Sequence, residues 1–175
     1  GARLGGDENR GALFELALIV VAGLLAYLFR QPLWADLRWN LADAMLGCAA
    51  AVPPLLVFWW LLHSKRYLAA TRDFLERAVR PFFSEWSLSQ LAIISALAGF
   101  CEEILFRGVI QGKLSELAGP TLSLALASLL FGCVHWVGLE YVVLAASIGA
   151  YLGGIWMSTG NLLVPIVAHA AYDFI

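Results

Sequence analysis

Charged residues are scarce in this sequence. Lysine, arginine, aspartate and glutamate together make up 14% of the 175 residues, whereas 61% of the residues are hydrophobic and the mean hydropathy is +0.79. A soluble domain normally carries about 25% charged residues. The composition therefore argues against an ordinary soluble protein. It predicts an all-α, polytopic transmembrane helix bundle that forms a single domain over residues 1–175.

Signatures of several other function classes are missing as well. The net charge of −2 gives no basic excess for binding nucleic acid, and the sequence contains neither a glycine-rich phosphate loop nor an HExxH zinc motif. The cysteines Cys48, Cys101 and Cys133 show no paired framework, so we interpret them as packing residues. Cys101, which precedes Glu102, could alternatively be a thiol nucleophile.

Long apolar runs organise the chain. We expect six spans, at about residues 11–29, 41–62, 87–114, 121–136, 141–157 and 162–175. The first run is too long for a signal peptide and lacks the context of a cleavage site. Pro53 and Pro54 lie in the middle of the second run, which they should kink or break.

The longest polar stretch covers residues 63–85. Its apolar residues recur at roughly helical spacing, which predicts an amphipathic helix on the bilayer surface; a solvated loop with a polar helix is the alternative. Residues 1–86 thus comprise two spans and this segment, and residues 87–175 comprise the other four. Most basic residues outside the spans fall on the side that holds both termini. The positive-inside rule therefore predicts cytoplasmic termini, in the inner membrane of a bacterial or archaeal cell.

Three ionisable residues interrupt the apolar run 91–110. Glu103 and Arg107 are four residues apart, so on a helix they share one face and can neutralise each other. Glu102 is turned away by about 100° and is left free. Ionisable residues inside a membrane are usually functional. The alternative is a buried ion pair that fixes helix packing, with Glu102 facing water at a helix end.

Three more polar residues occur in the later runs: His135, His169 and Asp173. His169 and Asp173 share one helix face because they are four residues apart. Counting about 1.5 Å per residue from the non-cytoplasmic links places these three residues and Glu102 at a similar depth. A lone histidine such as His135 more often serves in packing, but the common depth of four polar groups predicts a site. No serine lies within one turn of Glu102; Ser95 is two turns before it.

This set suits hydrolysis by an activated water. A desolvated Glu102, together with His135, could hold and deprotonate a water molecule. His169, with Asp173 beneath it, could donate to the oxyanion that forms at a peptide carbonyl. This mechanism needs no cofactor, and the spacing of the residues does not decide between it and a metal site. Alternatively, Glu102, His135 and His169, with Asp173 nearby, could bind zinc.

Three motifs carry a family resemblance. EEILFR (Glu102 to Arg107), FGCVH (Phe131 to His135) and HAAYD (His169 to Asp173) resemble EExxxR, FxxxH and HxxxN or HxxxD of the CAAX-protease and bacteriocin-processing (CPBP, Abi) family of intramembrane glutamic endopeptidases. The resemblance covers residues 87–175. It implies a protease that cuts a membrane-associated protein or peptide within the lipid bilayer. With this resemblance we favour the mechanism that needs no cofactor over the one that uses zinc.

The resemblance also implies roles for single residues. Glu102 matches the catalytic glutamate, His135 matches its water-activating partner, and His169 with Asp173 matches the pair on the oxyanion side. Glu103, Arg107 and Phe131 would support the site. Many family members carry asparagine at the position of Asp173. An ionised aspartate cannot donate to an oxyanion, so we favour Asp173 as an acceptor that orients His169.

The resemblance does not imply prenylated substrates, because the eukaryotic relatives that act on prenylated CAAX termini have additional helices. Two other function classes stay open at this point. One is a non-catalytic membrane partner, such as an immunity or scaffold protein that acts by binding. The other is a small proton-coupled transporter that uses the buried glutamate and histidines as a relay. We expect no nucleic-acid partner.

Overall fold

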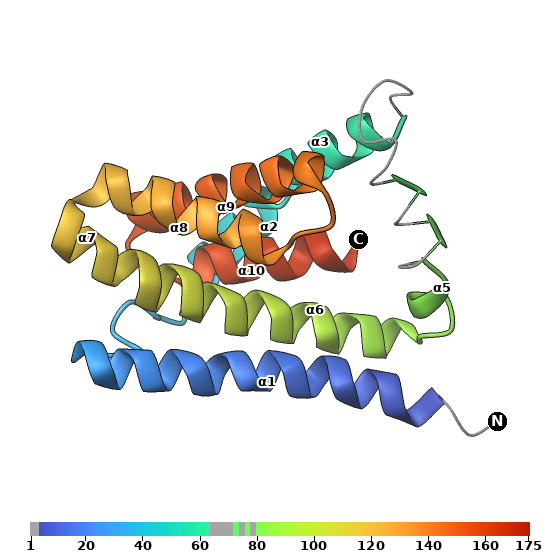
Figure 1. Ribbon diagram of the computed structural model, residues 1–175, viewed down its shortest axis with the longest axis horizontal. Helices are drawn as coiled ribbons and strands as arrows, with labels where there is room; N and C mark the ends of the chain where they lie inside the picture. Colours follow the sequence, from blue (N-terminus) through green and yellow to red (C-terminus); the bar gives the residue numbers. More distant parts are fainter. Residues whose placement is uncertain (1–3, 64–71, 74–75, 78–79) are drawn as a thin grey trace.

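The computed structural model describes residues 4–63, 72–73, 76–77 and 80–175, and this part of the chain is helical without any strand (Figure 1). This confirms the predicted all-α class. The elements, in chain order, are α1 (Leu4–Phe29), α2 (Leu41–Ala50), α3 (Val52–His63), α5 (Arg80–Phe83), α6 (Leu88–Glu103), η2 (Ile104–Gln111), α7 (Gly112–Ala118), α8 (Pro120–Val134), α9 (Leu139–Thr159) and α10 (Leu163–Phe174).

The helices coincide with the six predicted apolar runs. Three helical stretches are long and apolar enough to cross a membrane: Arg10–Phe29, Leu41–Leu61 and Leu139–Thr159. Two shorter apolar helices, Pro120–Val134 and Leu163–Phe174, complete the set together with the long rod formed by α6, η2 and α7. Many large apolar side chains on the outside are exposed, which suits contact with lipid. The chain is thus a helical membrane bundle.

The second span is broken where its prolines predicted a break. Helix α2 ends at Ala50 and α3 begins at Val52, so that Pro53 and Pro54 occupy the first turn of α3, where their missing N–H groups cost little. The predicted amphipathic helix over residues 63–85 falls mostly outside the described residues. Within that range the structure describes residue 63 at the end of α3, residues 72–73 and 76–77, and residues 80–85, which include the short helix α5.

One continuous rod carries the first sequence motif. Its start is fixed by a capping box, in which the Ser87 hydroxyl accepts from the Gln90 N–H and the Gln90 side chain accepts from the Ser87 N–H. The sequence predicted a plain α-helix to about Leu114, but Ile104–Gln111 is π-helical and largely buried. Such segments often occur at functional sites. This one begins directly after Glu103.

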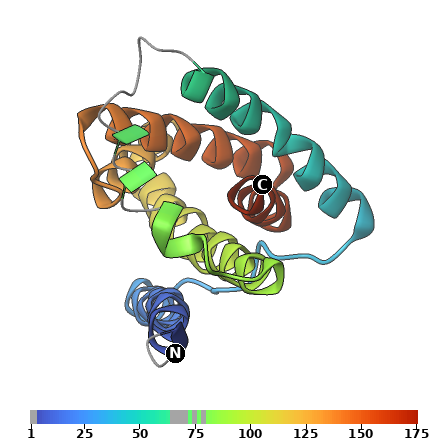
Figure 2. The same cartoon turned by 90° about the vertical axis from the view of Figure 1, so that its right-hand side faces the viewer.

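Helix α10 lies in the centre of the bundle (Figure 2). Viewed end-on, it is enclosed by α6, α9 and the α2–α3 pair, while α1 lies along the outer side of α6 (Figure 2). Gly99 lets α6 approach α10 closely: a Cβ atom there would lie 2.8 Å from both the Ala170 nitrogen and the Ile166 oxygen. This contact sets the spacing between the helices that carry Glu102 and His169.

Asn161 ties the turn before α10 to the start of the second span. Its side-chain nitrogen donates to the Arg38 carbonyl at 2.8 Å and to Asp43 Oδ2 at 2.6 Å, and its oxygen accepts from the Arg38 N–H at 2.9 Å. Asn161 is fully buried. The N-terminal end of α10 is therefore fixed by these hydrogen bonds as well as by packing.

Candidate active site

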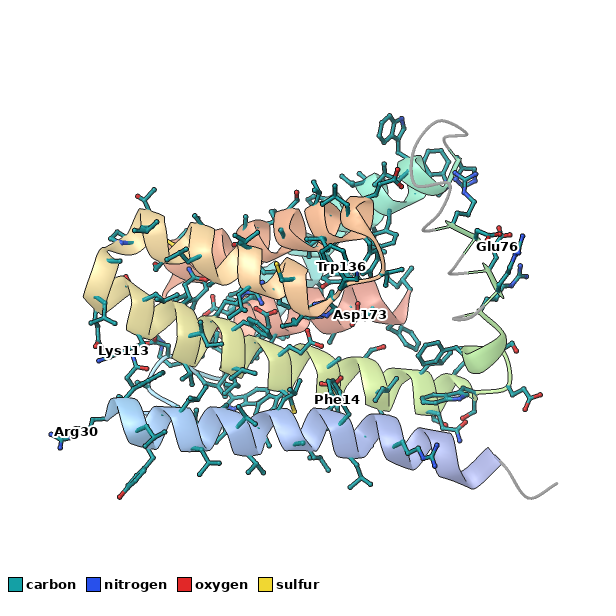
Figure 3. The ribbon with its side chains drawn as sticks, viewed as in Figure 1. Phe14, Arg30, Glu76, Lys113, Trp136 and Asp173 are labelled. Carbon is teal, nitrogen blue, oxygen red and sulfur yellow. The ribbon has the colours of Figure 1, made fainter. Side chains whose placement is uncertain are left out.

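A cavity of about 590 Å³ opens in the middle of the bundle. Its lining includes all four residues that the sequence proposed as catalytic: Glu102 from α6, His135 at the end of α8, and His169 and Asp173 from α10. Asp173 is seen between α10 and the α6 rod in Figure 3. The structure therefore brings together side chains from three helices that are far apart in the sequence.

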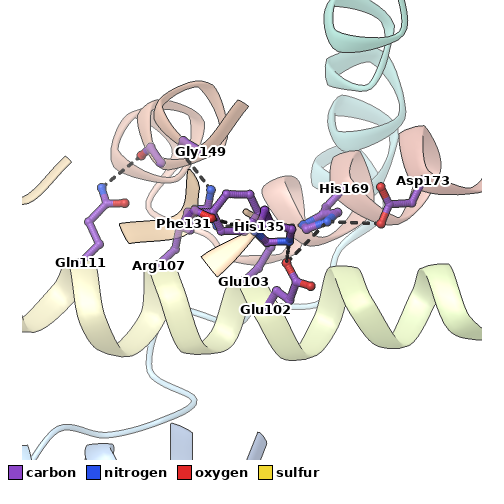
Figure 4. Close-up of polar contacts among 10 residues, drawn as sticks. Glu102, Glu103, Arg107, Gln111, Phe131, His135, Gly149, His169 and Asp173 are labelled. Carbon is purple, nitrogen blue, oxygen red and sulfur yellow. Dashed lines mark hydrogen bonds and ion pairs between the residues drawn. The ribbon is translucent and has the colours of Figure 1, made fainter. Parts of the chain in front are cut away.

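The Glu102 carboxylate faces the imidazoles of both His135 and His169 (Figure 4). Its Oε2 atom lies 3.5 Å from His135 Nε2 and 4.0 Å from His169 Nε2. The same oxygen is buried and has no hydrogen-bond partner among the described residues. These separations are long for direct hydrogen bonds, and both are within the range of an ion pair when the imidazole is protonated.

His135 has its tautomer fixed by the backbone of its own helix. Its Nδ1 lies 2.7 Å from the Phe131 carbonyl oxygen, which can only accept, so Nδ1 carries a proton. In a neutral ring Nε2 then presents a lone pair toward Glu102. A lone pair and a carboxylate repel each other, so the direct contact between them is favourable when Nε2 also carries a proton.

His169 is held between carboxylates on both sides of its ring. Nδ1 lies 2.8 Å from Glu103 Oε1, and Nε2 lies 3.3 Å from Asp173 Oδ2. The Tyr172 ring stacks on the imidazole with the centroids 5.0 Å apart. The contact with Asp173 has the geometry of the acceptor that the sequence suggested. The contacts with Glu103 and Tyr172 were missed.

The predicted Glu103–Arg107 ion pair is confirmed. Arg107 Nη1 donates to Glu103 Oε1 at 2.9 Å, and both side chains are almost fully buried. Arg107 Nη2 donates to the Gly149 carbonyl of α9 at 3.0 Å. The guanidinium thus ties the rod to α9 while it neutralises the carboxylate that orients His169.

Phe131 lies at the centre of the three motifs. The Arg107 guanidinium carbon lies 4.5 Å from the centre of its ring, and the rings of His135 and His169 have centroids 4.4 and 6.1 Å from it. A phenylalanine four residues before the histidine therefore has two tasks. Its carbonyl fixes the tautomer of His135, and its ring packs against residues of the other two motifs.

The alternative hypotheses for the site are a zinc site and a nucleophilic thiol. Among the described residues, no three histidine, cysteine, aspartate or glutamate side chains are arranged to hold a metal ion. Cys101 is buried but does not line the cavity, whereas Ser95 lines it two turns before Glu102. The zinc and glutamate alternatives make opposite predictions for the effect of a chelator.

One further carboxylate lines the cavity and was missed. Glu15 of α1 is 8% exposed and faces the same space as Glu102. The signal was present in the sequence, because Glu15 is the single charged residue of the first predicted span, residues 11–29.

The fold and the site define a helical membrane protein with a buried glutamate–histidine cluster. Residues 84–175, just over half of the chain, match the family described as "Type II CAAX prenyl endopeptidase Rce1-like". The chain belongs to this family. The matched range contains all three motifs, while α1 and Glu15 lie outside it.

Two relatives from Bacillus subtilis (strain 168) are similar to this chain. YpbD is 33% identical over 97 residues, which cover 54% of this chain and 47% of YpbD. A protein named "Putative membrane peptidase YdiL" is 32% identical over 80 residues, which cover 45% of this chain and 32% of that protein. The chain thus spans half or less of the length of these relatives. No solved structure shows a significant match.

Proposed function

We propose that this protein is an intramembrane endopeptidase that hydrolyses a peptide bond of a membrane-associated protein or peptide. Its family and the name of the relative YdiL support a peptidase. The observation that carries the mechanism is the unpartnered Glu102 Oε2, which faces the Nε2 atoms of His135 and His169 at 3.5 and 4.0 Å. In the proposed arrangement, the reacting water enters from the cavity that Glu102, His135 and His169 line, and it lies beside the base and the two imidazoles.

In the proposed reaction, Glu102 accepts a proton from this water as the water oxygen attacks the peptide carbonyl carbon. His135 Nε2 accepts the second hydrogen bond of the water and so aims its oxygen. The carbonyl oxygen becomes an oxyanion, to which protonated His169 donates the Nε2 hydrogen that it shares with Asp173 Oδ2 before substrate binds. Glu102 then delivers its proton to the amide nitrogen as the C–N bond breaks. The products are a carboxylic acid and an amine.

Glu103 and Asp173 would serve as positioning residues for His169. Glu103 is itself held by Arg107, so its acceptor oxygen is fixed before substrate arrives. We propose that substrate reaches the cavity past the broken second span, because Leu55 and Phe58 of α3 line it directly after the two prolines. The proposed orientation keeps both termini in the cytoplasm, with cleavage near the cytoplasmic leaflet.

Cleavage of transmembrane peptides by the purified protein tests this proposal, with wild type and Glu102→Gln each assayed with and without a chelator. We expect chelator-resistant cleavage that Glu102→Gln abolishes. Glu116→Gln is the matched control: it makes the same chemical change in the same rod, but on the exposed helix α7. Figure 3 shows its ion-pair partner Lys113 at the end of the rod remote from Asp173.

Two other results would replace the proposal. Stoichiometric zinc together with chelator-sensitive cleavage would assign Glu102, His135 and His169 to a metal site. A biological effect that survives Glu102→Gln would indicate a non-catalytic immunity or scaffold protein. Whether a prenyl group on the substrate matters is tested by comparing each peptide with its prenylated form.

A further inference from the structure

Glu15 is a buried carboxylate that the proposed reaction does not use. It is 8% exposed, and its Oε2 atom has no hydrogen-bond partner within the described part of the chain. An isolated ionised carboxylate in such surroundings costs several kcal/mol unless it takes up a proton or a cation neutralises it. No contact within the described residues therefore explains why a carboxylate lies at this place in the cavity.

The described lining of the cavity holds more acidic than basic side chains. Three carboxylates line it, those of Glu15, Glu102 and Asp173, and the basic groups beside them are the imidazoles of His135 and His169, because no lining residue is lysine or arginine. The nearby Arg107 is occupied by Glu103 and by the Gly149 carbonyl. The cavity therefore offers an acidic wall that an incoming positive charge would complement.

The position of Glu15 along the axis of the α6 rod follows from Gly11, which lies one turn before Glu15 in α1. A Cβ atom at Gly11 would lie 3.4 Å from Ile94 Cδ1, and α1 and α6 run side by side in the same direction (Figure 1). Glu15 therefore lies level with about Ala98, one turn before Glu102, which corresponds to about 6 Å along the helix axis. An extended peptide covers this distance in about two residues.

This depth is where basic side chains of membrane proteins are found. Glu15 is five residues from Arg10, the start of the apolar stretch, which places it about 7.5 Å into the span. Lysine and arginine concentrate at the cytoplasmic flanks of transmembrane segments and extend their charged ends toward water. The apolar stem of such a side chain would find Leu91 and Ile94 on the cavity wall.

We infer that Glu15 binds the cationic side chain of a lysine or arginine in the substrate. The bound residue lies within about two positions of the scissile bond, on its cytoplasmic side. This inference rests on the proposed endopeptidase function and on the proposed orientation. It gives the protein a specificity for basic substrates, through a helix that lies outside the matched family region.

The probes are synthetic transmembrane peptides that carry one lysine at successive positions of the cytoplasmic flank, each paired with a norleucine version. Binding is measured on the full-length Glu102→Gln protein, which needs no turnover, and cleavage is measured on wild type. We expect the best lysine peptide to bind and react about tenfold better than its norleucine partner, as for a hydrogen bond to a charged group.

Glu15→Gln keeps the shape of the side chain and should reduce the lysine-to-norleucine ratio of cleavage to about one. The double variant Glu15→Gln, Glu102→Gln should reduce the corresponding ratio of binding to about one. Glu116→Gln should leave the ratio as in wild type. Equal binding of lysine and norleucine peptides at every position, or a preference that survives Glu15→Gln, would overturn the inference. If wild type cleaves none of the peptides while the Glu102→Gln protein still binds the lysine peptides selectively, the result would count against the proposed function and not against the role of Glu15.

Discussion

The Nδ1 atom of His169 lies 2.8 Å from Oε1 of Glu103, although the two residues are 66 positions apart. The two adjacent glutamates therefore face the same imidazole from different sides. Glu102 faces its Nε2 edge across a gap, and Glu103 contacts its Nδ1 edge directly. The double glutamate of the first motif is thus explained as one proposed base and one positioning residue.

Replacement of Glu103 tests this division. Glu103→Gln keeps the side-chain shape but removes the charge that neutralises buried Arg107, which should lower the free energy of unfolding by about 3–5 kcal/mol. Cleavage should also fall by about 10–100-fold in the protein that remains folded, because His169 loses its orienting carboxylate. Denaturant titration in detergent and peptide cleavage measure the two effects. A variant with the unfolding free energy of wild type would contradict the structural role.

Arginine at position 107 should not be replaceable by lysine. The guanidinium donates to Glu103 and to the Gly149 carbonyl with two different nitrogens while it covers the Phe131 ring. An ammonium keeps the charge but cannot reproduce this planar fork. We expect Arg107→Lys to lose about 1–3 kcal/mol of unfolding free energy. Arg107→Ala should lose more. Equal stability of the lysine variant and wild type, measured by the same denaturant titration, would refute the bidentate role.

Asparagine should substitute for Asp173 better than alanine. Asp173 Oδ2 lies 3.3 Å from His169 Nε2, and the amide oxygen of asparagine can accept from the same atom. Asp173→Asn should therefore keep cleavage within about tenfold of wild type, while Asp173→Ala loses about 10–100-fold as a missing orienting partner would. Steady-state cleavage of one peptide compares the two variants. If both are equally impaired, the charge or proton of Asp173 is required rather than an acceptor.

Local spacing explains why the sequence predicted much of this site. Glu103 with Arg107 and Phe131 with His135 are each four residues apart, so their contacts follow from helix geometry alone. The apolar runs likewise predicted the helices, because lipid requires long hydrophobic segments. The proline pair predicted the break in the second span for an equally local reason.

The features that the sequence did not predict depend on tertiary structure. The contact of His169 with Glu103 joins residues that local spacing cannot relate. The residues of Ile104–Gln111 are compatible with an ordinary α-helix, so the sequence did not indicate its π-helical hydrogen bonds. Glu15 is different, since the principle that identified Glu102 as an ionisable residue in an apolar run applies to it equally.

The close approach of α6 and α10 gives a final prediction that separates geometry from chemistry. An alanine Cβ at position 99 would lie 2.8 Å from the Ala170 nitrogen and the Ile166 oxygen, both backbone atoms that cannot turn aside. Gly99→Ala must therefore push α10 away from the rod and widen the gap between Glu102 and His169. We expect cleavage to fall at least about 100-fold, the scale reported for a catalytic group misplaced by about 1 Å. Gly154→Ala is the control, because a Cβ there meets nothing within 4 Å and should leave cleavage unchanged. Both variants are assayed as folded protein purified in detergent. Full activity in Gly99→Ala would mean that the helix spacing does not set the distance between the proposed base and the oxyanion donor.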